Sequence, residues 1–139
     1  MDTDITYTKE KDTHNFHVNT HLVDIDQQTP IQGSMPVSMD YVYSKQGVTI
    51  KMDHCPYSAY MVLPVITSLL DVTEVDSKNM RIRKENGILE ISCVNGYLKV
   101  APTDADGRIF NPVPGFSFIP LQVFPESPSK KIIVKIIYN

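Results

Sequence analysis

The sequence contains no tryptophan, only two cysteines and no apolar run long enough to cross a membrane as a helix. Its 139 residues carry a formal net charge of −3, and no stretch of it is polybasic. Binding to nucleic acid or to an anionic membrane surface needs a basic field, so the composition argues against both partners and against membrane insertion. No signal peptide is recognisable at the start of the sequence, which leaves a cytoplasmic protein and a mature secreted protein open.

Signatures of the common catalytic sites are also missing. The motifs GxSxG, Walker A and GxGxxG do not occur. His54 and Cys55 are neighbours, but adjacent residues of a strand point to opposite faces and would not activate each other. His14, His17 and His21 would share a face on a helix and could bind zinc there, whereas the alternation around them favours a strand. We therefore expect a protein that is not an enzyme and that holds no metal or cofactor.

Two further motifs have simple structural interpretations. Residues 104–107 (DADG) resemble the start of a calcium-binding loop, but the twelfth position is Gly115, where that loop needs a glutamate. A hairpin turn is expected there instead.

Cys93 is expected on the inner face of a strand as a small hydrophobic residue. Two free thiols are therefore favoured over a disulfide between Cys55 and Cys93. The disulfide stays an alternative if the protein is in an oxidising compartment.

Two Asn-Gly pairs are the strongest structural signal in the sequence. Asn86-Gly87 and Asn95-Gly96 are flanked by alternating apolar residues, and Asn-Gly favours the two-residue type I′ hairpin turn. Pairing across the first turn places Ile82 opposite Ile91, and pairing across the second makes residues 97–101 the next strand of the same sheet. Both pairings select the same inner face, so the register is well specified.

A third hairpin is predicted between residues 37–43 and 48–52, with Tyr41 opposite Ile50 and Tyr43 opposite Val48. Tyrosines gather in and after this hairpin, and those in register with apolar neighbours are expected in the core. The alternative is that exposed rings on a flat sheet stack on sugars or anchor a partner. The tyrosines concerned are Tyr41, Tyr43, Tyr57 and Tyr60.

The pattern as a whole predicts an all-β fold of about ten short strands, an antiparallel β-sandwich of immunoglobulin-like or jelly-roll-like type. Residues 1–13 are expected to form a polar N-terminal arm or a short edge strand, and residues 14–139 a single domain. A long strand is predicted over residues 14–26, and residues 58–72 are interpreted as two strands joined at Pro64. The β-prone segment Ile132–Tyr138 must pair inside a sheet or join another chain.

Three features of residues 80–139 support a family resemblance. They are the strand–turn–strand unit GILEISCVNGYLKV, the turn Asp104–Arg108 followed by Ile109 and Phe110, and the closing strand IIVKIIYN. In these features the segment resembles the C-terminal β-sandwich domains that direct Bacteroidetes proteins through the type IX secretion system. The resemblance implies a secreted, seven-stranded immunoglobulin-like module without catalysis, which export machinery recognises.

The function expected from the sequence is a non-catalytic, extracellular or surface-exposed module that binds another protein. The proline-rich loop after residue 110 is the candidate binding surface, because rigid loops present recognition groups at a low ordering cost. One alternative is a protease-inhibitor-like protein acting through this loop, and another is a viral or phage structural subunit. A homo-oligomer formed through the C-terminal strand is also open. The candidate binding residues are Asn111, Pro112, Val113, Pro114, Gly115 and Phe116.

Overall fold

The computed structural model describes residues 3–21, 36–53, 55, 60–66, 71–100, 118–127 and 129–139. Within these ranges eleven strands form two antiparallel sheets, which confirms the predicted all-β sandwich. The strands are β1 (Asp4–Glu10), β2 (Thr13–Thr20), β3 (Val37–Ser44), β4 (Gly47–Asp53), β5 (Met61–Ile66), β6 (Val72–Val75), β7 (Asn79–Lys84), β8 (Gly87–Val94), β9 (Gly96–Val100), β10 (Phe118–Pro125) and β11 (Ile132–Tyr138).

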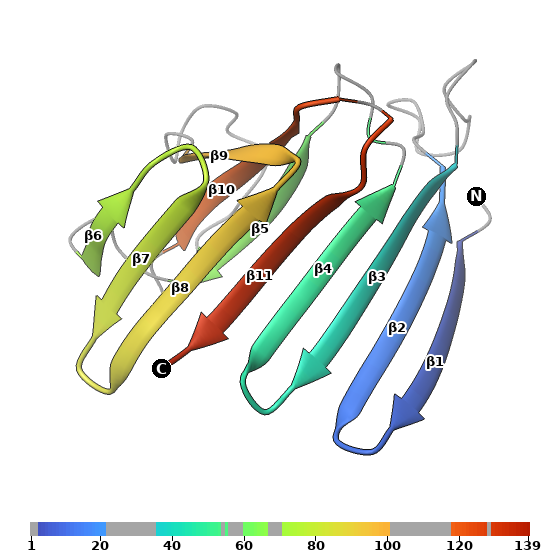
Figure 1. Ribbon diagram of the computed structural model, residues 1–139, viewed down its shortest axis with the longest axis horizontal. Coiled ribbons are helices and arrows are strands. Elements are labelled where there is room, and N and C mark those ends of the chain that lie inside the picture. Colours follow the sequence, from blue (N-terminus) through green and yellow to red (C-terminus); the bar gives the residue numbers. More distant parts are fainter. Residues whose placement is uncertain are drawn as a thin grey trace.

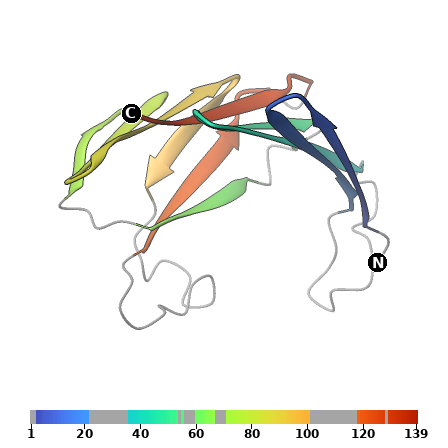
Figure 2. The ribbon, with the colours of Figure 1, turned by 90° about the horizontal axis from the view of Figure 1, so that it is seen from below.

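The larger sheet has eight strands in the order β1-β2-β3-β4-β11-β8-β7-β6, and the smaller sheet has the order β5-β10-β9 (Figure 1). The large sheet arches over the small one, which lies toward the β8 end (Figure 2). The β1–β2 hairpin extends at the opposite end (Figure 2). The polar start of the chain is thus an edge strand, the second of the two forms expected for it.

The core lies between the inner faces of the two sheets. Ile82, Ile132 and Val134 of the large sheet are fully buried, as are Leu121 and Val123 of the small one. Each such side chain contributes roughly 1.5–3 kcal/mol through removal from water. Strand alternation alone places these residues inward, because every second side chain of a strand points to the same face.

The β3–β4 hairpin has the predicted register. Tyr41 pairs with Ile50 and Tyr43 with Val48, and the turn itself is Lys45-Gln46. β11 lies between β4 and β8, so both of its hydrogen-bonding edges are used within the chain. A homo-oligomer formed through β11 would have to replace these hydrogen bonds with bonds to a second chain. Formation of such an oligomer stays a prediction.

The turn at Asn86-Gly87 differs from the expected type I′ hairpin. Gly87 pairs with Lys84, so Ile82 faces Leu89 instead of Ile91. The pairing has moved by two residues, which keeps the same inner face. A Cβ on Gly87 would overlap the Asn139 carbonyl oxygen, and the Tyr138 hydroxyl donates to the Asn86 carbonyl at 2.8 Å. The end of β11 therefore packs on this turn and stabilises the observed register.

The prediction of a hairpin at Asn95-Gly96 was wrong. Asn95 does adopt a left-handed φ of 62°, but the chain there leaves the large sheet and enters the small one. The Asn95 side-chain amide donates to the Lys131 carbonyl at 2.9 Å, and the Asn95 backbone carbonyl accepts from the Glu126 backbone amide at 3.1 Å. The position beside β8 that a hairpin partner would take is filled by β11, in which Val134 pairs with Cys93.

The interpretation of Pro64 as a joint between two strands was also wrong. Pro64 lies within the continuous strand β5, opposite Pro120 of β10. Proline has no amide hydrogen to donate, and β5 is an edge strand where that donor is not needed. Pro120 lies within β10, the central strand of this sheet, whose pairing with β9 among the described residues runs from Leu121 to Pro125. The strand predicted over residues 14–26 is seen from Thr13 to Thr20, and residues 22–26 lie outside the described residues.

Candidate functional site

The inner face of the large sheet continues beyond the core onto β1, β2 and β3. Along β3 the inward-facing residues run from Val37, which is 5% exposed, through the half-buried Met39 and Tyr41 to Tyr43, which is 42% exposed. Tyr7 of β1 is 51% exposed and Phe16 of β2 is 36% exposed. We call this open, shallow depression the aromatic face, and it is lined by Ile5, Tyr7, His14, Phe16, Val18, Tyr41 and Tyr43.

Strand pairing brings the aromatic side chains of this face together. Tyr7 pairs with Phe16, which pairs in turn with Tyr41, so three rings follow one another across three strands. The rings of Tyr7 and Phe16 have centroids 4.9 Å apart, and Phe16 meets Tyr43 edge-on at 5.8 Å. The rings therefore hold one another in place, as aromatic pairs at such separations do.

Polar atoms lie among the rings of the aromatic face. The Tyr7 hydroxyl is 2.6 Å from Nδ1 of His14, and the Tyr41 hydroxyl donates to the sulfur of Met39 at 3.6 Å. Burial, with a smaller contribution from Tyr43, raises the pKa of the Tyr41 hydroxyl. The face thus combines flat apolar surfaces with hydrogen-bonding groups.

The aromatic face departs from the expectation that these tyrosines belong to the core. Tyr43 is an exposed residue, and Tyr41 is only half-buried. Tyr60 is half-buried and packs on Phe124 with ring centroids 5.0 Å apart, whereas Tyr57 lies outside the described residues. The register with apolar neighbours was predicted correctly, but the small sheet does not cover the whole inner face.

Comparison with known protein families decides where this fold belongs. A family model described as the ulvan lyase C-terminal domain matches residues 1–139. The chain belongs to the ulvan lyase C-terminal domain family. The match corrects the resemblance to type IX sorting domains, because it accounts for the whole chain and residues 1–79 had no place in that resemblance. A search of curated proteins gave no match.

Membership of the ulvan lyase C-terminal domain family bears on the functional alternatives. It gives no support to a protease inhibitor or to a viral structural subunit. The loop residues 111–116 proposed as the binding surface lie outside the described residues, as do His54 and the predicted calcium-like turn at 104–107. In the described part of this ulvan lyase domain, no helix is long and apolar enough to span a membrane.

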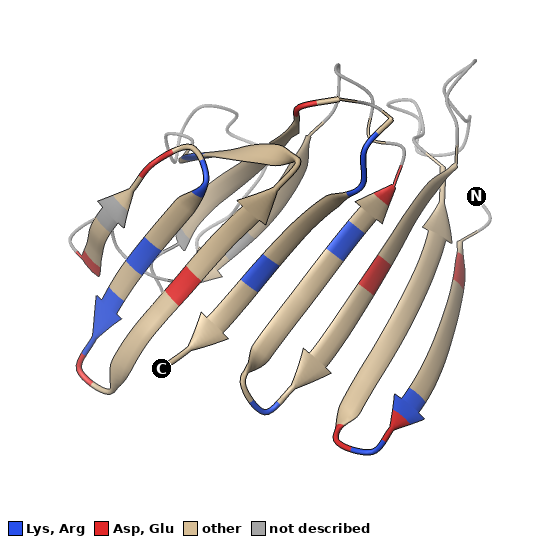
Figure 3. Cartoon of the chain, viewed as in Figure 1, with Lys and Arg blue, Asp and Glu red and all other residues tan. Residues whose placement is uncertain are grey.

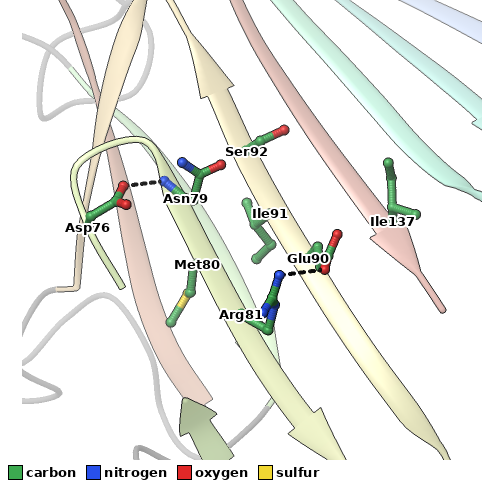
Figure 4. A pocket seen from close by; sticks show the side chains of 8 residues that line it. All are labelled: Asp76, Asn79, Met80, Arg81, Glu90, Ile91, Ser92 and Ile137. Carbon is green, nitrogen blue, oxygen red and sulfur yellow. Dashed lines mark hydrogen bonds and ion pairs between the residues drawn. The ribbon is translucent and has the colours of Figure 1, made fainter. Parts of the chain in front are cut away.

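A second pocket in this ulvan lyase domain involves β7, β8 and the turn before β7 (Figure 4). Its charged groups are bonded to neighbouring protein groups. Arg81 forms an ion pair with Glu90 at 3.1 Å, and the Asp76 carboxylate accepts the amides of Lys78 and Asn79 at 2.7 and 2.8 Å. These amide bonds lower the pKa of Asp76. The pocket's polar groups thus hold the turn and the strand pair together, so the aromatic face is the stronger candidate site.

The structure separates the remaining residues that the sequence singled out. His14 lies on the aromatic face, whereas His17 points to the outer face, where its Nδ1 is 2.7 Å from the Asp40 carboxylate. Among the described residues, no three histidine, cysteine or acidic side chains gather to hold a metal ion. Cys55 and Cys93 are both buried, and burial raises the pKa of both thiols, that of Cys93 to about 11.

Proposed function

We propose that the chain is a non-catalytic accessory domain of an extracellular polysaccharide lyase, and that it holds ulvan on its aromatic face. The observation that carries the proposal is the exposed ladder of rings in a domain whose family is that of ulvan lyases. Tyr7, Phe16 and Tyr43 leave between 36% and 51% of their surfaces open to solvent in one continuous depression.

The chemistry of this face suits a sugar chain. A pyranose ring has apolar C–H faces that pack on aromatic rings, and hydroxyl groups at its edge that need hydrogen-bond partners. The rings of Tyr7, Phe16 and Tyr43 supply the first, and His14 with the tyrosine hydroxyl groups supplies the second. An open depression admits a polymer that continues beyond it, whereas small molecules are usually bound in concave sites that surround them.

The same openness favours binding over catalysis. Enzymes exclude water from the reacting atoms and place charged groups around them in a low-dielectric site. Among the described residues that line the aromatic face there is no carboxylate, lysine or arginine, and the nearest charged groups lie at the exposed turns of the first two hairpins. The catalytic residues of the lyase would then belong to another part of the enzyme.

Binding measurements with matched tyrosine variants test this proposal. We expect the purified chain to bind ulvan in isothermal titration calorimetry, and Phe16→Ala and Tyr43→Ala to weaken binding about tenfold or more, as central aromatic contacts do. Tyr97→Ala is the control, because Tyr97 is as exposed as Tyr43, at 42%, but lies on β9 of the small sheet. Thermal unfolding would confirm that each variant is folded.

Two results would overturn the proposal. One is the absence of ulvan binding by the unaltered chain, or an equal loss in Tyr43→Ala and Tyr97→Ala. The other is lyase activity of the isolated chain, seen as release of unsaturated sugar products that absorb in the ultraviolet.

An extracellular location is part of the same proposal. An intact polysaccharide cannot cross a membrane, so a lyase that cleaves it must act outside the cell, and family membership supports this location. An antiserum against the chain should detect it in the culture medium or at the cell surface. The rest of the lyase is the protein partner that family membership suggests, and this partner stays a prediction.

A further inference from the structure

A second hollow adjoins the aromatic face at the ends of the first two hairpins. It shares His14 and Tyr43 with the aromatic face, so the two surfaces are continuous. We call it the lysine rim, and its lining residues are Lys9, Lys11, Asp12, His14, Tyr43, Ser44 and Lys45. A polymer lying over Phe16 and Tyr43 would reach the rim without leaving the surface.

The topology explains why lysines from distant parts of the sequence meet here. The antiparallel pairing of β2 with β3 sets His14 opposite Tyr43, which places the β1–β2 and β3–β4 turns at the same end of the sheet. Lys11 and Lys45 occupy those turns, and Lys9 pairs with His14. Figure 3 shows positively charged segments at the ends of both hairpins, with negatively charged segments beside them at the β1–β2 turn.

The charges of the lysine rim are not neutralised within the described part of the chain. Three ammonium groups line the rim with a single carboxylate, that of Asp12, and Lys9, Lys11 and Lys45 take part in no ion pair there. By contrast, Lys78, Lys84 and Lys131 elsewhere are paired with Glu126, Asp71 and Asp53. The Glu10 carboxylate lies at the same turn, in a neighbouring hollow with Lys11 and Asp12, so the two turns together carry three lysines and two carboxylates. This leaves a small local positive excess on a chain of net charge −3.

We propose that the lysine rim binds acidic groups of the polysaccharide, carboxylate or sulfate, while the neighbouring sugar rings stack on the aromatic face. This inference rests on the proposed function and assigns the contacts to the acidic groups of the polymer to the lysine rim. A neutral polymer would use the aromatic face alone. An acidic polymer gains contacts to ammonium groups that are already exposed, so no ion pair within the described part of the protein has to break first.

Titration of two charge-matched variants at two salt concentrations tests the inference. The rim variant carries Lys9→Gln, Lys11→Gln and Lys45→Gln. The control variant carries Lys99→Gln, Lys130→Gln and Lys135→Gln, which remove the same charge from exposed positions outside the rim. We expect the rim variant to bind ulvan about tenfold more weakly at low salt, from three exposed charge contacts, and the control to bind as the unaltered chain does.

Salt provides the second readout. The affinity of the unaltered chain should fall between 50 and 500 mM NaCl because salt screens exposed charges, and the affinity of the rim variant should change much less. Phe16→Ala should weaken binding at both salt concentrations, because stacking is not screened. Carboxyl-reduced ulvan and desulfated ulvan then distinguish the two kinds of acidic group. If one of these polymers binds more weakly than ulvan and its binding no longer depends on salt, the group removed from it is the group that the lysines bind.

The unfavourable outcomes distinguish the lysine rim from the proposed function. Equal affinity of the rim variant and the unaltered chain at low salt would overturn the lysine rim, whereas a loss in Phe16→Ala in the same experiment would leave the proposed function standing. Equal losses in the rim and control variants would also overturn the rim, because net charge alone would then explain the effect. No binding of any polysaccharide by the unaltered chain would overturn both proposals.

Discussion

The hydroxyl oxygen of Tyr7 lies 2.6 Å from Nδ1 of His14, and the two rings are stacked with centroids 5.9 Å apart. Lys9 stands directly opposite His14, and Tyr7 directly opposite Phe16, so Tyr7 and His14 are diagonal neighbours across the β1–β2 pair. This contact orients the Tyr7 ring beside Phe16 on a strand whose residues are all exposed. An edge strand with little burial thus positions its main aromatic ring through this polar contact together with packing on the rings of His14 and Phe16.

Tyr7→Phe should leave stability almost unchanged and weaken polysaccharide binding severalfold. The exposed hydrogen bond exchanges with bonds to water, so its removal is expected to change the unfolding free energy by less than about 1 kcal/mol. The ring, no longer held by His14, has to be ordered when the ligand binds. Urea unfolding and calorimetric titration measure the two effects separately. A stability loss well above 1 kcal/mol would contradict this interpretation and make the contact structural.

Gly96→Ala should destabilise the fold by about 1–3 kcal/mol, the usual cost of inserting a methyl group into a packed site. A Cβ at this position would lie 2.7 Å from the Phe124 carbonyl oxygen and 3.1 Å from the Cys93 sulfur. The backbone contact cannot relax through a side-chain rotation. Lys99→Ala, at an exposed position of the same strand, is the control and should change stability by less than about 0.5 kcal/mol. Similar urea midpoints for the two variants would show that the corner between the sheets adjusts freely.

Ile132→Ala should cost about 2–5 kcal/mol, because Ile132 is fully buried at the start of the central strand β11. Ile137→Ala is the matched control on the same strand. Ile137 is 37% exposed, so its substitution should cost less than half as much stability.

Deletion of residues 130–139 should leave an unfolded chain, because β4 and β8 would both lose their partner. Light scattering and circular dichroism check this. A folded monomer released from an oligomer after the deletion would mean that β11 joins two chains.

The unfolding free energy should fall as pH rises from about 9 to 11. Burial raises the pKa of the Cys93 thiol to about 11, from an ordinary 9.0. The unfolded chain loses this proton near pH 9 and the folded protein keeps it to about pH 11, so high pH favours the unfolded state. The decline from this one group is at most about 1.4 kcal/mol per pH unit. Cys93→Ala should show a shallower decline in urea unfolding across this range.

The matched control for the alkaline prediction is Val123→Ala. This substitution also removes a fully buried side chain but no titratable group. It should lower stability at every pH and keep the decline of the unaltered protein. Parallel curves for Cys93→Ala and the unaltered protein would assign the pH dependence to other groups.

Much of the candidate site could be read from the sequence, but its exposure could not. The alternation of residues placed Tyr41 and Tyr43 on one face of β3, and Phe16 and Val18 together on one face of β2. The predicted register of the β3–β4 hairpin was correct. The tyrosines were nevertheless assigned to the core. A signal against the core was present in the neighbouring strand, where polar residues surround Ile5 and Tyr7 and indicate an edge.

The sequence by itself determined the all-β class, the inner faces of the strands and the β3–β4 hairpin with its register. These features depend on the two-residue period of a strand and on turn residues a few positions apart, so each is contained in a short segment. Only the tertiary structure decided that β11 takes the place beside β8, that Asn95 begins a crossing between sheets, and that the small sheet leaves the aromatic face open. Those outcomes depend on competition between strands far apart in the sequence for the same edges and the same buried surface, which no local pattern records.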